Sequence, residues 1–62
     1  MLKDNLKLLR EERNISQKQL AEYLHVSYKT ISHWENGVSE PSINLIIALK
    51  RYFNCDYEEL IE

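Results

Sequence analysis

Two short helical patterns joined by a very short connection lie between Ser16 and Gly37, and this connection limits the fold more than any other feature. Apolar residues of the two patterns recur at helical spacing: Leu20, Ala21, Leu24, Ile31 and Trp34. Only about three residues separate the patterns, as in a helix-turn-helix arrangement. The two helices must therefore meet at a steep angle, with the methyl group of Ala21 at their contact.

Polar residues mark the ends of both predicted helices. Ser16 with Gln19 three residues later is typical of a capping box, and Ser27 offers a hydroxyl cap for the second helix. Gly37 suits a left-handed stop after it. His25 falls where the chain is expected to turn with positive φ, so we interpret it as a turn residue and not as a ligand.

The second helix, about residues 27–36, leaves a polar side once Ile31 and Trp34 face inward. Its members are Tyr28, Lys29, Ser32, His33 and Asn36. All five can form hydrogen bonds, Lys29 is positively charged, and none is needed for a core. The simplest interpretation is a solvated helix face, and the alternative is a surface that reads DNA bases.

The chain resembles a known family along nearly its whole length. The residues that carry the resemblance are Leu6, Leu9 and Arg10, Ser16-Gln17, Leu20-Ala21, Leu24, Val26-Ser27, Ile31, Trp34-Glu35-Asn36-Gly37, Pro41-Ser42, Tyr52-Phe53-Asn54 and Leu60. They are similar to those of the Cro and lambda-repressor-like (XRE) transcriptional regulators. The resemblance implies an all-α, compact five-helix bundle, a single domain over residues 1–62, with a helix-turn-helix formed by its second and third helices.

The resemblance also implies roles for individual residues in reading double-stranded DNA through the major groove. Base edges would meet Tyr28, Lys29, Ser32 and His33. The sugar-phosphate backbone would meet Gln17, Lys18, Asn36, Ser39 and Ser42. Gln17 lies at a helix start, where free N–H groups attract an anion. The expected function is a transcriptional regulator of phage or bacterial type, a repressor that occupies a palindromic operator and excludes polymerase.

Arg10 and Glu35 lie beside apolar positions, and the family pattern pairs an arginine with a glutamate here. We predict an ion pair that ties the first helix to the end of the third and serves orientation, not chemistry. The alternative is a pair of unrelated surface charges, since most such pairs contribute little to stability.

The net charge of −2 at first argues against DNA binding. However, residues 1–51 hold all eight Lys and Arg residues against six acids, whereas residues 52–62 hold four acids and no base. This distribution predicts a dipolar molecule that turns its basic side toward phosphates. The single cysteine, Cys55, excludes an intrachain disulfide and fits a reducing cytoplasm, and no apolar run approaches the roughly 18 residues of a membrane span.

A fourth helix is expected to begin with Pro41 in its first turn and to run to about Phe53. Its predicted inward face consists of Ile43, Ile46, Leu49 and Phe53. Asn54 is a plausible stop, and Asp56 a cap for a last short helix. Apolar side chains left outside the core would form a patch for a weak homodimer: Leu45, Tyr52, Tyr57 and Ile61.

No catalytic or cofactor site is expected. His25, His33 and one cysteine do not have the spacing of a zinc site, and Ser32 next to His33 lacks a third orienting group. We therefore expect neither an enzyme nor a metal protein. A function from another class stays open, namely an antitoxin-like module that covers a protein partner with the fourth and fifth helices. The operator sequence, an inducer and the choice between repression and activation also stay open.

Overall fold

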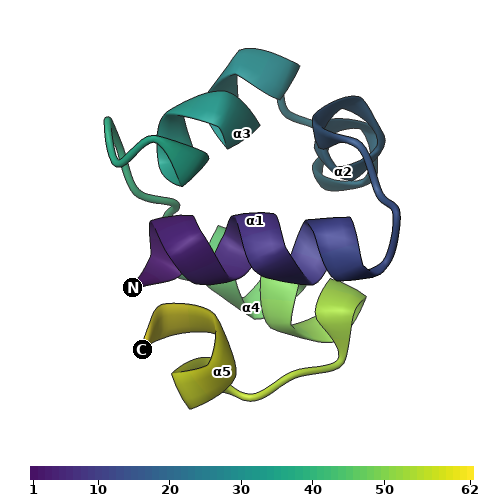
Figure 1. Ribbon diagram of the computed structural model, residues 1–62. Coiled ribbons are helices and arrows are strands. Elements are labelled where there is room, and N and C mark those ends of the chain that lie inside the picture. The colour runs from purple at the N-terminus through teal and green to yellow at the C-terminus, as the bar shows by residue number, and fades with distance from the viewer.

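Five helices follow one another along the chain, and the computed structural model, which describes all 62 residues, contains no strand. They are α1 (Leu2–Glu12), α2 (Gln17–Leu24), α3 (Tyr28–Glu35), α4 (Ile43–Phe53) and α5 (Tyr57–Ile61). Figure 1 shows α1 across the middle of the molecule, with α2 and α3 on one side of it and α5 on the other. The all-α, five-helix fold expected from the sequence is confirmed.

The helix-turn-helix is bounded by the caps that the sequence predicts. The Ser16 hydroxyl accepts a hydrogen bond from the Gln19 amide (3.0 Å), and the Gln19 side chain accepts one from the Ser16 amide (2.8 Å). His25 ends α2 in the left-handed conformation (φ 59°). The Ser27 hydroxyl caps α3 by accepting from the Thr30 amide, and Gly37 after α3 has φ 75°. These local signals therefore set both ends of both helices.

The start of α4 differs from the prediction. Ser42 is the N-cap, and its hydroxyl accepts from the Leu45 amide, so Pro41 precedes the helix instead of lying in its first turn. Pro41 is also buried. Because Pro has no amide hydrogen to give, it fits before the cap, where no helical bond is required of it. The predicted end is correct, since Asn54 has φ 52°.

A core of apolar side chains from every helix holds the molecule together. Its buried members are Leu2, Leu6, Leu20, Ala21, Leu24, Ile31, Trp34, Leu49, Phe53 and Leu60. The inward face predicted for α4 is wrong at Ile43, which is 72% exposed. At 100° per residue, Ile43 and Ile47 point away from the side of α4 that buries Leu49.

Three members of the predicted dimer patch pack against this core instead of standing outside it. Leu45, Tyr52 and Ile61 are partly buried there. The ring of Tyr52 lies 4.5 Å from that of Tyr23 and 5.0 Å from that of Phe53, measured between centroids. Tyr52 thus joins α4 to α2. Burial of its large aromatic ring against Tyr23 and Phe53 is favourable, so the ring packs inside the molecule and not in an exposed dimer patch.

The last helix is short and is held against α1 by burial and by backbone contacts. Leu60 is fully buried, and the Asn5 amide group donates a hydrogen bond to its carbonyl oxygen (3.1 Å). Asp56 caps α5 in a second capping box with Glu59. The Met1 ammonium group donates to the Glu62 carbonyl oxygen (3.0 Å), so the two ends of the described chain meet beside α5 (Figure 1).

Candidate nucleic-acid interface

The outward side of α3 is polar, and it is held outward by burial of the opposite side. Ile31 and Trp34 are 0% and 3% exposed, respectively, and pack into the core. The side chains of Tyr28, Lys29 and His33 are exposed, and Ser32 is half-buried between them. We call Tyr28, Lys29, Ser32 and His33 the α3 strip. Rotating α3 to hide this strip would expose a tryptophan and an isoleucine, which the hydrophobic effect opposes.

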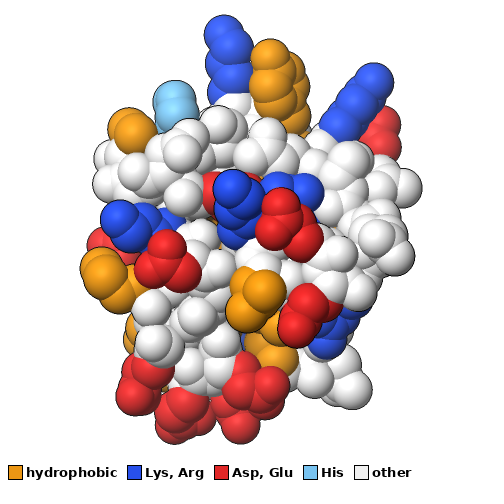
Figure 2. Space-filling model, in the orientation of Figure 1, with side chains coloured by type: hydrophobic (Ala, Val, Ile, Leu, Met, Phe, Trp, Pro, Cys, Tyr) orange, Lys and Arg blue, Asp and Glu red, His pale blue; other side chains and the backbone are white.

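The charges of the molecule are separated between its two ends. Figure 2 shows Lys and His side chains at the end formed by α2 and α3, and a group of Asp and Glu side chains at the end formed by α5. Asp56, Glu58 and Glu59 all lie at the start of α5. The α3 strip therefore belongs to the more basic end, away from most of the acids of the last eleven residues.

A buried carboxylate joins three helices behind the α3 strip. Glu35 accepts hydrogen bonds from Arg10 Nε (2.8 Å) and Nη2 (3.0 Å), with side chains only 4% and 12% exposed. Arg10 Nη1 also donates to the Ile15 carbonyl oxygen (2.9 Å). The hydrogen bonds to Glu35 raise the pKa of Arg10 above its ordinary value, against the opposing effect of burial. The structure thus contains the ion pair expected between α1 and α3.

Gln17 joins this ion pair, a contact that sequence reasoning missed. Its Nε2 donates to Glu35 Oε1 at 3.1 Å. The amide nitrogen has two hydrogens, and one of them is now committed to Glu35. The other is left to donate elsewhere from the first residue of α2. No local signal reveals this contact, because it depends on how α2 and α3 are placed across 18 positions of sequence.

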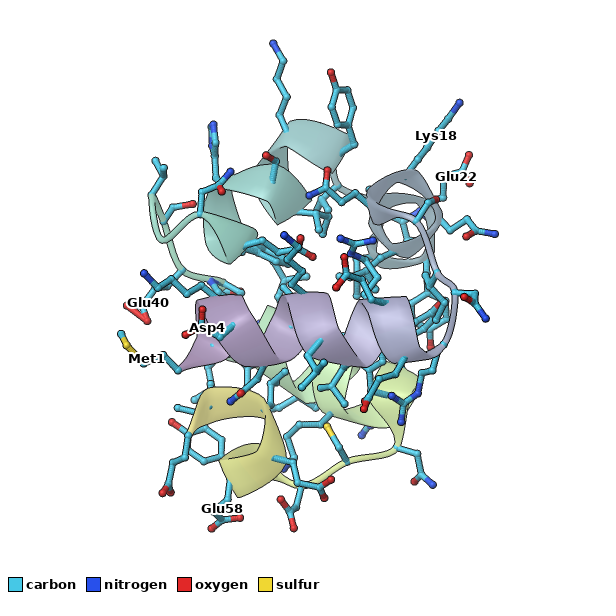
Figure 3. All side chains as sticks on the ribbon, viewed as in Figure 1. Met1, Asp4, Lys18, Glu22, Glu40 and Glu58 are labelled. Atoms are coloured by element: carbon cyan, nitrogen blue, oxygen red, sulfur yellow. The ribbon has the colours of Figure 1, made fainter.

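The other residues expected to face a DNA backbone come from α2, from the loop after α3 and from the start of α4. Lys18 is exposed on the first turn of α2, and Figure 3 shows it pointing away from the molecule beside Glu22. Ser39 is exposed, and its amide donates to the carbonyl oxygen of His33 at the end of α3 (3.4 Å). The hydroxyl of Ser42 caps α4. Lys18 thus lies on the helix before α3 and Ser39 in the loop after it, whereas Ser42 belongs to the start of α4.

Asn36, the residue that ends α3, contacts the strip directly. Its Nδ2 donates to the Ser32 hydroxyl oxygen one turn earlier, at 3.2 Å. Its backbone amide also donates to the Ser32 carbonyl oxygen (2.9 Å). Asn36 and Ser32 are therefore joined by two hydrogen bonds at the end of the helix.

Of the predicted dimer patch, only Tyr57 is largely exposed, at 47%. The exposed apolar side chains of α4 are Ile43 and Ile47, which lie one turn apart. The α4–α5 side thus has apolar surface, but Ile43, Ile47 and Tyr57 form it, and of these only Tyr57 belongs to the predicted patch.

Cys55 is half-buried between α4 and α5. Burial raises the pKa of its thiol, and the nearby acids Glu59 and Asp56 add to that effect. No three His, Cys, Asp or Glu side chains gather closely enough to hold a metal ion. None of the five helices is both long and apolar enough to cross a bilayer.

Two helices at a tight turn, the second with its polar side held outward, define a helix-turn-helix protein. The chain belongs to the helix-turn-helix family of the XRE type, whose family model matches residues 6–60. The family resemblance found in the sequence is thereby confirmed. A crystal structure of a transcriptional regulator from Listeria innocua superposes with a TM-score of 0.92 and 32% sequence identity, over 97% of this chain and 56% of that one.

Two relatives carry names that bear on function. The HTH-type transcriptional activator BcrR of Enterococcus faecalis is 36% identical over 58 residues, which are 94% of this chain and 28% of BcrR. The antitoxin PezA of Streptococcus pneumoniae is 31% identical over 61 residues, which are 98% of this chain and 39% of PezA. The chain thus spans well under half the length of both relatives.

Proposed function

We propose that this chain binds double-stranded DNA in a sequence-specific manner and thereby regulates transcription, with α3 entering the major groove. The observation that carries the proposal is the α3 strip, whose polar side chains are held outward by the buried Ile31 and Trp34. Membership in the helix-turn-helix family supports DNA binding in transcription regulation. In such proteins the second helix of the motif lies in the major groove.

The chemistry of the strip suits base edges. Lys29 fits the O6 and N7 acceptors of guanine, and Tyr28 can donate a hydrogen bond or contact a thymine methyl group. His33 can donate or accept through its ring nitrogens. In this proposal the phosphates on either side are met by Gln17, Lys18, Asn36, Ser39 and Ser42. Gln17 Nε2 donates one of its two hydrogens to Glu35, and this bond fixes the direction in which the second hydrogen can donate to a phosphate.

Selection of random duplexes by the purified protein, followed by sequencing, tests the proposal directly. We expect a defined site, with Kd increased about five- to 150-fold by Lys29→Ala, because a specific base contact contributes about 1–3 kcal/mol. Lys50→Ala on α4 is the matched control and should leave Kd unchanged. A wild-type protein that enriches no sequence would overturn the proposal.

The proposal includes a palindromic operator bound by a weak homodimer, in which the α4–α5 side around Tyr57 meets its copy. Two recognition helices about 34 Å apart would then read two half-sites. Sedimentation on operator DNA is expected to show two chains per site, and Tyr57→Ala to weaken that assembly. One chain per site would contradict it. A promoter-reporter assay decides the sign of regulation, which we propose to be repression, although BcrR is named an activator.

A second function is favoured by the similarity to PezA. In this alternative the chain is an antitoxin-like module that binds a protein partner with α4 and α5. The two functions separate by substitution. If Tyr57→Ala abolishes function while Lys29→Ala and His33→Ala leave it intact, the protein-partner function is supported. Loss of function in Lys29→Ala and His33→Ala supports DNA reading, in which Tyr57→Ala affects only the dimer.

A further inference from the structure

The hydrogen bond between Asn36 and Ser32 gives one member of the α3 strip a fixed hydrogen-bonding direction. Asn36 Nδ2 donates to Ser32 Oγ (3.2 Å), and the Asn36 backbone amide donates to the Ser32 carbonyl oxygen (2.9 Å). The backbone bond holds Asn36 in place, and the Asn36 side chain then donates to the Ser32 hydroxyl. Ser32 itself lies one turn after Tyr28, on the outward side of α3.

A serine hydroxyl has one hydrogen to donate and two lone pairs that accept. In Ser32 one lone pair already accepts the Asn36 amide hydrogen. A hydroxyl that accepts a hydrogen bond becomes a stronger donor, because the two bonds polarise each other. The Ser32 hydroxyl hydrogen is therefore left to donate to solvent in the free protein and to a ligand when one is bound.

We propose that Asn36 is a positioning residue that makes Ser32 a hydrogen-bond donor toward the major groove, so that Ser32 selects a base with an acceptor edge. This inference rests on the proposed function. Guanine presents N7 and O6 as acceptors, and thymine presents O4. Cytosine presents only its N4 donor in that groove, so it is the base that Ser32 disfavours.

Three variants test the inference. Ser32→Ala removes the hydroxyl. Asn36→Asp has the same shape but can only accept, so the Ser32 hydroxyl must donate to it and turn its lone pairs toward the DNA. The double variant S32A/N36D keeps the new charge without the hydroxyl. Because an added carboxylate weakens binding to every sequence through phosphate repulsion, the order of the four bases is the measurement, not overall affinity.

The experiment starts from the site that the wild-type protein selects. Kd is then measured at one salt concentration for duplexes carrying each of the four bases at each position. We expect one position where cytosine weakens wild-type binding about three- to tenfold, the effect of one hydrogen bond. S32A should remove that preference at this position alone. N36D should reverse it in favour of cytosine, and S32A/N36D should match S32A.

Asn54→Asp, which adds the same charge at the exposed end of α4, is the control and should leave the base order unchanged. Thermal melting checks that each variant is folded. An unchanged base order in N36D or in S32A overturns the inference while leaving the proposed function intact. A wild-type protein that selects no sequence overturns both.

Discussion

Glu35 is a single residue on which the placement of three helices depends. Its carboxylate is almost completely buried and accepts hydrogen bonds from Arg10 twice and from Gln17 once. A buried charge is tolerated only with such partners, because desolvation of an unpaired carboxylate is strongly unfavourable. Glu35 therefore fixes α3 relative to α1 and α2 through polar contacts that have strict geometry.

Arg10→Met should lower the free energy of unfolding by about 3 kcal/mol, since it leaves the Glu35 carboxylate buried with only the Gln17 amide. Urea denaturation followed by circular dichroism measures the change. The control is the double variant R10M/E35L, which removes both charges and should recover part of the loss. A single variant as stable as the wild type would show that the pair is not needed for stability.

The Cys55 thiol should react slowly with iodoacetamide at pH 8. Because burial and nearby acids raise its pKa, the thiolate fraction at a given pH is below that of a free cysteine, and the reaction should become fast only at higher pH. The rate is measured by mass spectrometry over a pH series. The unfolded chain in urea is the comparison, and an equal rate in the folded and unfolded protein would contradict the prediction.

At the scale of single elements, the turn between α2 and α3 contains a residue, His25, whose replacement by glycine should stabilise the protein. His25 has φ 59° and ψ 42°, a conformation that costs a residue with a Cβ about 1 kcal/mol. His25→Gly should raise the free energy of unfolding by about 0.5 kcal/mol, because glycine's larger unfolded-state entropy offsets part of that gain. Thermal melting measures it.

His25→Ala serves as the matched comparison for this turn. Alanine keeps the Cβ but tolerates positive φ less well than histidine does, so it should destabilise the protein. If the glycine and alanine variants melt at the same temperature, the backbone conformation at this position is not what limits stability.

Apart from the start of α4, the helix ends were predictable from the sequence, whereas the full set of side chains that α4 turns toward the core was not. Caps such as Ser16 and Asp56 act through hydrogen bonds to amides three residues away, so a local pattern reveals them. The orientation of α4 depends on which of its large apolar side chains pack against the rest of the core. Ile43 and Leu45 are equally apolar, and only the packed molecule decides that Leu45 faces inward.

In the candidate site, too, one part was predictable from the sequence and another was not. The outward position of the α3 strip follows from Ile31 and Trp34 on the same helix, and helical periodicity was enough to predict it. The Gln17–Glu35 and Asn36–Ser32 hydrogen bonds depend on side-chain rotamers and, for Gln17, on the angle between two helices. Neither the rotamers nor the angle between the helices can be predicted from the spacing of residues along the sequence.

At the scale of the whole molecule, the separated charges predict how DNA binding depends on salt. With few cations at the α2–α3 end, log Kd should change with log salt less steeply than for a strongly basic protein. Lys18→Ala should reduce that slope by about 1, the effect of one phosphate contact. Kd measured over a salt series checks this, with Lys50→Ala on α4 as a control that should leave the slope unchanged.

The contact between the first and last residues has a consequence for the connectivity of the chain. Since the Met1 ammonium nitrogen lies 3.0 Å from the Glu62 carbonyl oxygen, a peptide link of a few glycines would close the backbone into a ring without moving a helix. Such a circular polypeptide would lose fewer conformations on folding and should resist heat better than the linear one. New ends opened elsewhere in the ring, for example at the exposed loop near Asn54, would give a permuted chain with the same recognition helix.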